Sequence, residues 1–313
     1  MLQASFKTEV QMRLTRIEVS RLATIASSAL VIAGGLAQAQ DAMIPAPHQH
    51  RPISVRRVHD DQTSVDSTNW SGYAVTGAAS SVTLAAGSWV VPTATCPVGT
   101  RRHAAPAEYA SFWVGIDGWS SDSVEQLGTD SDCSNGTPSY YAWYEFYPEP
   151  SYYASCSARQ ERLGQCTGSG NLTSLHPGDV MSASVSYTSN GSFTLAITDE
   201  TSKASFSVVV TPNSRTGTPQ RSSAEWIAEA PSSSSGILPL ADFGTVGFGY
   251  DSTRIIGTCS ATVGGLGPYP IGSFGTNVWS STMVTNSDVV KAAPSVLSSD
   301  LSSFSVTWAN AGP

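Results

Sequence analysis

Three stretches of the sequence place carboxyl and amide side chains among aromatic residues. They are residues 111–118 followed by 125–130, residues 140–148, and residues 223–229. Carboxyl groups serve as general acids and bases, and a carboxyl group shielded from water by its neighbours is a candidate for a raised pKa. These stretches are therefore the candidate sites of chemistry.

Alternation along a strand decides which of these side chains share a face. In the second stretch one face would carry a carboxylate between aromatic rings: Tyr141, Trp143, Glu145 and Tyr147. An unpaired Glu145 in a core would cost roughly several kcal/mol, so this face is predicted to line an open, concave surface. In the third stretch Glu225, Ile227 and Glu229 share a face, opposite Trp226.

Other hydrolytic chemistries lack their residues. After residue 67 the only histidines are His103 and His176, too few for a histidine-rich zinc site. No Gly-x-Ser-x-Gly motif, Asp-Thr-Gly pair or phosphate-binding glycine loop is present. A Ser-His-Asp triad would need His103 or His176, and His176 is predicted to lie in a turn before a strand. We expect no metal and no cofactor.

The elements that must position these residues are predicted to be strands. Short β-branched and aromatic runs alternate with turn residues at 70–76, 82–91, 110–116, 140–147, 180–188, 192–198, 205–210, 224–228, 245–248, 254–258 and 304–308. Asn190-Gly191 predicts a tight hairpin between two of them. The fold class is therefore all-β, with two antiparallel sheets packed as a sandwich, while residues 260–300 are hard to assign.

Composition and charge indicate where the protein works and which partners it can bind. Only 13% of the residues are charged, which is typical of exported β-rich proteins, and the net charge of −8 argues against nucleic acid as a partner. Residues 1–39 are predicted to be a secretory signal that starts at Met12, so we expect a secreted protein that does not span a membrane. We also expect a monomer.

Residues 40–67 differ from the single domain expected at 68–313. They contain His48, His50 and His59 with several arginines and prolines, which is typical of an extended, poorly ordered segment. One hypothesis is a pro-segment that covers an acidic cleft, leaves as falling pH charges its histidines and neutralises the carboxylates, and is cut between Arg57 and Asn69. A solvated linker is the alternative.

Five cysteines in an exported chain imply disulfides with one cysteine left over. Cys156 and Cys166 could close a small loop, and Cys96 with Cys133 is a plausible second pair, which would leave Cys259 free. The sequence alone does not fix this pairing.

The ordered motifs resemble those of the eqolisins, a family of glutamic peptidases. The resemblance rests on Asn69-Trp70-Ser71-Gly72-Tyr73, Trp89-Val90-Val91-Pro92 and the three stretches above, and it runs from Asn69 to about Gly249. It implies a β-sandwich with the active site on its concave face and acid endopeptidase activity on polypeptide substrates. Residues 119–123 lack the cysteine that the family pattern has before its glutamine.

The resemblance also implies roles for individual residues. Gln126 would be the catalytic glutamine, which stabilises the oxyanion, and Glu225 the catalytic glutamate, which activates water. The residues that would line the cleft are Trp70, Trp113, Asp117, Asp130, Trp143, Glu145 and Tyr147.

A β-sandwich with aromatic residues on a concave face is also how lectin-like modules bind sugars. The alternative functions are therefore carbohydrate binding, or a glycosidase that uses Glu145 and Glu225 as its pair of carboxyl groups.

Overall fold

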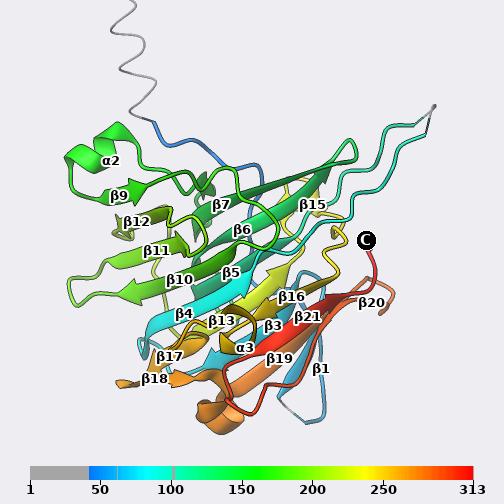
Figure 1. Ribbon diagram of the computed structural model, residues 1–313. Coiled ribbons are helices and arrows are strands. Elements are labelled where there is room, and N and C mark those ends of the chain that lie inside the picture. The colour runs from blue at the N-terminus through cyan, green and yellow to red at the C-terminus, as the bar shows by residue number, and fades with distance from the viewer. Residues whose placement is uncertain (1–41, 62, 101–102, 313) are drawn as a thin grey trace, which may run out of the picture.

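The computed structural model describes residues 42–61, 63–100 and 103–312, and most of its regular structure is β (Figure 1). The helical elements are α2 (Ala158–Arg162), α3 (Tyr250–Thr253) and the 3-10 helix η1 (Ile271–Asn277). The strands up to residue 153 are β1 (Val55–Val58), β2 (Ser64–Ser67), β3 (Trp70–Thr76), β4 (Val82–Val90), β5 (Ser111–Ile116), β6 (Val124–Ser134), β7 (Thr137–Tyr147) and β8 (Tyr152–Tyr153).

The later strands complete both layers of the fold. They are β9 (Cys166–Ser169), β10 (Val180–Tyr187), β11 (Phe193–Asp199), β12 (Ser205–Val210), β13 (Ser223–Glu229), β14 (Ser232–Ser233), β15 (Gly236–Ile237), β16 (Thr245–Phe248), β17 (Ser260–Val263), β18 (Leu266–Pro270), β19 (Val278–Val284), β20 (Val290–Pro294) and β21 (Phe304–Trp308).

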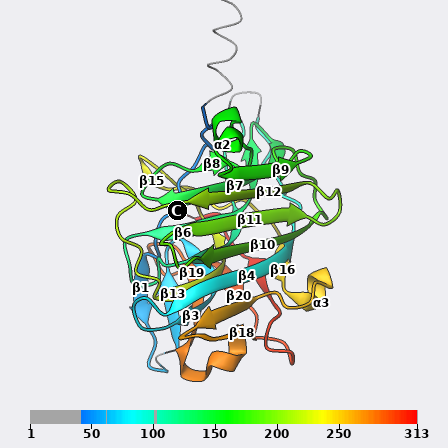
Figure 2. The same ribbon diagram turned by 90° about the vertical axis from the view of Figure 1, so that its left-hand side faces the viewer.

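Two layers of strands face each other. The first layer runs in the order β8-β7-β6-β5-β13-β3-β19-β2-β1, all antiparallel except the parallel pair β19–β2. The second layer runs in the order β9-β12-β11-β10-β4-β17-β18, and Figure 2 looks onto its outer face. Strands β16, β21 and β20 join the layers at one side. The predicted antiparallel sandwich is confirmed.

Alternation places two different apolar clusters on the two faces of the first layer. Trp226, Val114 and Phe146 point between the layers, where they join Phe193 and Leu195 of the second layer in the main core. The opposite face carries a smaller cluster of Trp70, Trp113, Val124, Tyr141, Trp143 and Ile227, with Tyr147 packed against it. The predicted faces of residues 140–147 and 223–229 are therefore confirmed.

Most of the predicted strands lie within one or two residues of the observed ones, and residues 180–198 form the predicted hairpin around Gly191. The expected strand at 254–258 was wrong, because α3 ends there with Arg254 in the left-handed region (φ 63°). Strand β6, which carries Gln126, was not among the predicted strands, because Gly, Asp and Ser interrupt its apolar pattern. The segment 260–300 contains β17 to β20.

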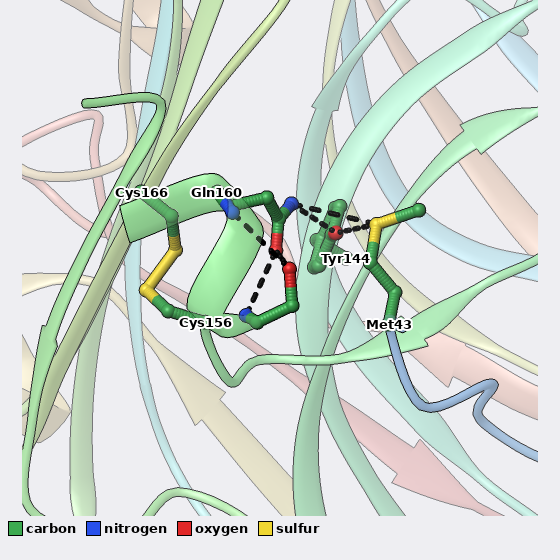
Figure 3. The surroundings of a disulfide bond; sticks show 6 residues. Met43, Tyr144, Cys156, Gln160 and Cys166 are labelled. Carbon is green, nitrogen blue, oxygen red and sulfur yellow. Dashed lines mark hydrogen bonds between the residues drawn. A yellow bond between two sulfur atoms is a disulfide. The ribbon is translucent and has the colours of Figure 1, made fainter. Parts of the chain in front are cut away.

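Disulfides join Cys96 to Cys133 and Cys156 to Cys166, and Cys259 is free and buried, so the plausible pairing is confirmed. The second disulfide closes the excursion that contains α2. Figure 3 shows how this excursion holds the start of the described chain: the Met43 sulfur lies 3.0 Å from the Tyr144 hydroxyl and 3.4 Å from the Gln160 amide nitrogen.

Residues 42–61 are bound to the first layer instead of forming the poorly ordered segment that their composition predicts. The blue segment in Figure 1 begins beside α2 and ends at β1, which pairs with β2 and through it with β19. The segment is ordered because its backbone groups find partners on the sheet. It covers the face that carries the candidate catalytic residues.

Candidate active site

Gln126 lies in the middle of β6, where neighbouring strands bring other polar residues into line with it. The register aligns Glu225, Gly115, Gln126 and Glu145 across four adjacent strands, so the side chains of this row point to one face. Gly115 leaves room for the amide, because a Cβ there would lie 3.1 Å from Cβ of Gln126 and 2.9 Å from the Trp113 ring. A side chain at position 115 would therefore displace Gln126 or Trp113.

The N-terminal segment crosses this face as an extended chain, hydrogen-bonded on both sides. On one side, Ala46 N–H donates to the Ser151 carbonyl at 2.9 Å. On the other, Gln49 and Ser232 exchange backbone hydrogen bonds of 3.0 and 2.8 Å. Further along, Ile53 N–H donates to the Gly118 carbonyl at 3.0 Å. Paired backbone of this kind is how a cleft between strands binds an extended peptide.

His50 is the centre of this contact and is fully buried. Its ring stacks on Trp143 with centroids 3.4 Å apart, and its Nδ1 lies 2.9 Å from Oε2 of Glu145. The same Glu145 oxygen accepts the His50 backbone N–H at 2.8 Å. On the other side of the ring, Nε2 lies 3.1 Å from Oγ of Ser111 and 3.4 Å from Oδ1 of Asp130. Glu145 is thus buried with a partner, which the sequence did not predict.

The peptide unit between His50 and Arg51 joins two polar side chains from distant strands. Gln126 Nε2 donates to the His50 carbonyl oxygen at 2.6 Å, and Arg51 N–H donates to Oε1 of Glu229 at 3.1 Å. The other oxygen of Glu229 accepts the Trp113 indole N–H at 2.8 Å. Because the carbonyl carbon lies between these two contacts, an amide donor and a carboxyl group flank a single peptide bond.

Charges in the site are strongly coupled. Burial by itself lowers the pKa of His50, but the charges and hydrogen bonds of Asp130 and Glu145 outweigh it and raise this pKa to about 10. Burial raises the pKa of Glu229 to about 8, although the charge of His50 opposes the shift. Burial also raises the pKa of Glu145. For Asp130 the charge of His50 outweighs burial, and its pKa is lowered.

The structure places Glu225 apart from this peptide unit. Both of its carboxyl oxygens are buried, and neither has a hydrogen-bond partner among the described residues. Burial raises its pKa well above the ordinary value, and the charges of Asp117 and Glu125 add to the shift. Glu125 is buried and its pKa is raised in the same way, again with Asp117 beside it. Glu225 therefore belongs to a cluster of three buried acidic residues.

This cluster makes a stability prediction for Glu225→Gln. Because the folded-state pKa is raised, protonated Glu225 contributes stability that is fully present below the unfolded pKa near 4.3 and is lost as pH rises through the folded pKa. At pH 7 we expect the variant to be more stable than wild type by roughly 1–3 kcal/mol in the free energy of unfolding. Each kcal/mol raises the unfolding temperature by about 2–4 °C. Near pH 4 the two proteins should unfold at the same temperature. Thermal unfolding at both pH values measures this, and Glu161→Gln on the exposed helix α2 should change neither temperature.

The remaining predicted cleft residues divide into two groups. In the first group, Trp143, Glu145 and Asp130 contact the N-terminal segment. Trp113 donates a hydrogen bond to Glu229, and the Trp70 ring packs edge-on against the Trp113 ring with centroids 4.9 Å apart. Asp117 does something else: its carboxylate accepts the backbone N–H groups of Arg221 and Ser222 at 2.6 and 2.9 Å. Asp117 thus holds the loop before β13. Glu229, Ser111 and His50 were not predicted as site residues, although alternation had placed Glu229 on the correct face.

One group in the described part of the chain has the composition of a metal site: His48, Asp130 and Asp132. His48 Nε2 lies 3.2 Å from Oδ2 of Asp132, and the Tyr141 hydroxyl donates to both aspartates at 2.9 and 2.7 Å. Hydrogen bonds thus link these groups to one another and to Tyr141, although Oδ1 of Asp132 has no partner among the described residues. We therefore interpret Asp130 and Asp132 as the floor of the cleft beneath His48.

Comparison with known proteins decides the family. The Peptidase A4 family pattern matches residues 68–160 and 166–293, which is more than half of the chain. The chain belongs to the peptidase A4 family, the eqolisins. The chain is also similar in sequence to aspergillopepsin-2 from Aspergillus niger. The two are 32% identical over 140 residues, and the match covers 44% of each protein.

Solved structures agree on the fold. The eqolisin sandwich resembles scytalido-glutamic peptidase with a transition-state analogue inhibitor, with a TM-score of 0.56, 24% identity, and coverage of 77% of this chain and 98% of that one. It also resembles SCP-B, an eqolisin in complex with the tripeptide Ala-Ile-His, with a TM-score of 0.52, 21% identity, and the same coverage of 77% and 98%. At this identity the likeness supports the shared architecture.

Membership of a peptidase family counts against the carbohydrate alternatives, and the structure gives them no support: Glu145 is paired with His50, and Glu225 lies in the acidic cluster. Within residues 42–61, 63–100 and 103–312, no helix has the length and apolar character of a membrane span.

Proposed function

We propose that this eqolisin is a secreted acid endopeptidase that hydrolyses peptide bonds with Gln126 and Glu229. The observation that carries the proposal is the pair of contacts on the peptide unit between His50 and Arg51. Gln126 donates to its carbonyl oxygen, and Glu229 accepts from its nitrogen. The glutamate of the pair is then Glu229 and not Glu225, since Glu225 reaches neither atom.

The contacts support a hydrolysis in which one glutamate moves one proton. Ionised Glu229 takes a proton from water, and the oxygen of that water bonds to the carbonyl carbon. Negative charge moves onto the carbonyl oxygen, which the Gln126 N–H stabilises by about 3–4 kcal/mol. As the carbon–nitrogen bond breaks, Glu229 returns the proton to the nitrogen, which leaves as an amine. The other product is a carboxylate, and no further reactant is needed.

Neighbouring side chains position the pair. The Trp113 indole N–H holds one Glu229 oxygen, so the other faces the nitrogen of the bound peptide. Gln126 Nε2 also lies 3.4 Å from Glu145, which fixes the orientation of the amide with its N–H toward the carbonyl oxygen. An amide that must always donate is well suited to acid, because glutamine does not titrate.

We expect hydrolysis of a denatured protein by the processed enzyme to be confined to acid pH. In a cleft open to water, Glu229 loses the burial that raises its pKa and ionises nearer the ordinary value of about 4.3. It can then act as a base in acid, where protonation of the leaving amine is also favoured.

The measurement is release of acid-soluble peptides across about pH 2 to 8, with an aspartic-peptidase inhibitor and a chelator in parallel samples. Activity that survives both reagents and disappears toward neutral pH supports the proposal. Inhibition by the chelator would contradict it, as would a maximum above pH 7.

A further inference from the structure

The cleft of this protein holds part of its own chain in the manner of a substrate. Residues 44–54 run extended over the candidate active site, and partners on both walls bind their backbone. Beyond the central peptide unit, the Asn69 amide donates to the carbonyl oxygens of Arg51 and Pro52, and its side-chain oxygen accepts the Ser54 N–H at 2.8 Å. The segment thus fixes which peptide bond faces Gln126 and Glu229.

The side chain of His50 occupies a closed pocket made by four residues: Trp143, Glu145, Asp130 and Ser111. We call it the histidine pocket. Trp143 forms its wall by ring stacking. Glu145 contacts Nδ1 of the ring, and Ser111 and Asp130 contact Nε2. A flat ring that donates a hydrogen bond from each side satisfies every one of these contacts. An aliphatic side chain would remove the ring contacts of Glu145, Asp130 and Ser111 within a buried pocket, which costs binding free energy.

We propose that the histidine pocket makes the enzyme cleave on the carboxyl side of histidine, and that its first substrate is its own His50–Arg51 bond. This inference rests on the proposed function. Water adds to the His50 carbonyl carbon, and the bond to the Arg51 nitrogen breaks. That nitrogen takes the proton, so the body begins with the free amine of Arg51 and the released piece ends in the carboxylate of His50.

The position of the cut agrees with how the two pieces are held. Residues 55–58 form β1, which pairs with β2 and through it with β19, so the chain after Arg51 stays part of the sheet. In the described part of the chain before Arg51, residues 42–50 are held along the cleft and at α2. A cut between Arg57 and Asn69, the sequence-based expectation, would instead fall within or beside these paired strands.

A fall in pH by itself does not efficiently release residues 44–54 from the cleft. The groups that face His50 are Asp130 from β6, Glu145 from β7 and Glu229 from β13. His50, Glu145 and Glu229 all have raised pKa values, so their contribution to docking is present at low pH and lost as pH rises. Only Asp130, with its lowered pKa, weakens docking as pH falls. Charging of His50 cannot drive release either, because the docked ring is already charged at neutral pH.

The first test follows the cut in the full-length secreted chain at acid pH by N-terminal sequencing and intact mass. Wild type should acquire Arg51 as its N-terminus, and Glu229→Gln should keep the bond. His50→Leu should slow the cut by about tenfold or more, because leucine cannot replace the ring's contacts with Glu145, Asp130 and Ser111. The matched substitution His59→Leu, outside the cleft, should leave the rate unchanged.

The second test measures kcat/KM for the peptide Ala-Pro-His-Gln-His-Arg-Pro-Ile-Ser-Val, which copies residues 46–55, and for a version with leucine in place of its second histidine. The processed enzyme should prefer the first by about tenfold or more. Glu145→Gln should reduce this ratio several-fold, while Glu149→Gln, just beyond the same strand, should keep it.

Two results would overturn the inference while leaving the proposed function intact. One is an enzyme that degrades denatured protein at acid pH but keeps the His50–Arg51 bond or begins between residues 58 and 69. The other is a ratio near one for the two peptides. Cutting of the same bond in Glu229→Gln would assign it to another peptidase and also overturn it. Failure to degrade any substrate would refute the proposed function, and this inference with it.

Discussion

Replacing Glu229 with glutamine should lower kcat for a denatured protein by about 10²–10⁴-fold, because the variant cannot take a proton from water or return it to the leaving nitrogen. Glutamine has nearly the same size, and its single carbonyl oxygen can still accept the Trp113 N–H, so the fold should be kept. The measurement is the initial rate of peptide release at the wild-type pH optimum, with thermal unfolding as the check on folding.

The decisive comparison is the same substitution at Glu225, four residues earlier on the same face of β13. We expect Glu225→Gln to retain activity within a few-fold, because that carboxyl group contacts neither the His50 carbonyl nor the Arg51 nitrogen. An inactive Glu225→Gln beside an active Glu229→Gln would assign the catalytic role to Glu225. It would then mean that the contacts of the docked segment differ from those of a substrate.

Replacing Gln126 with alanine should lower kcat by about 10²–10³-fold, the usual effect of removing one donor to a developing oxyanion. The Gln126 contact with the His50 carbonyl oxygen strengthens as charge develops there, so kcat and kcat/KM should fall together while KM changes little. Steady-state kinetics on the peptide that copies residues 46–55 measure both parameters.

Two further variants make the Gln126 result specific. Gln126→Glu should also be impaired, and increasingly so as pH rises, because an ionised carboxylate cannot donate to the oxyanion. Gln165→Ala removes an exposed amide next to the Cys156–Cys166 disulfide and should have wild-type kinetics. A Gln126→Ala variant with higher KM and unchanged kcat would show that the amide only binds substrate.

Sequence periodicity was enough to predict much of the fold. β-branched and aromatic runs with two-residue alternation predicted most of the strands and the hairpin at Gly191. They also showed which side of residues 140–147 and 223–229 faces the core. These features are local, since a strand shows its buried face in its own residues. The family motifs are likewise local patterns, and by themselves they indicate the eqolisins.

Tertiary structure alone decided which polar residues meet. Glu225 and Glu229 have the same residue type, the same face and the same strand, so no local pattern separates them. Their difference comes from the path of residues 44–54, which brings the Arg51 nitrogen to Glu229 while Glu225 is left beside Asp117 and Glu125. The same path buries Glu145 with His50, from segments 95 positions apart. Contacts over such separations depend on how the strands are ordered and which chain covers them, and the residues on either side do not encode this.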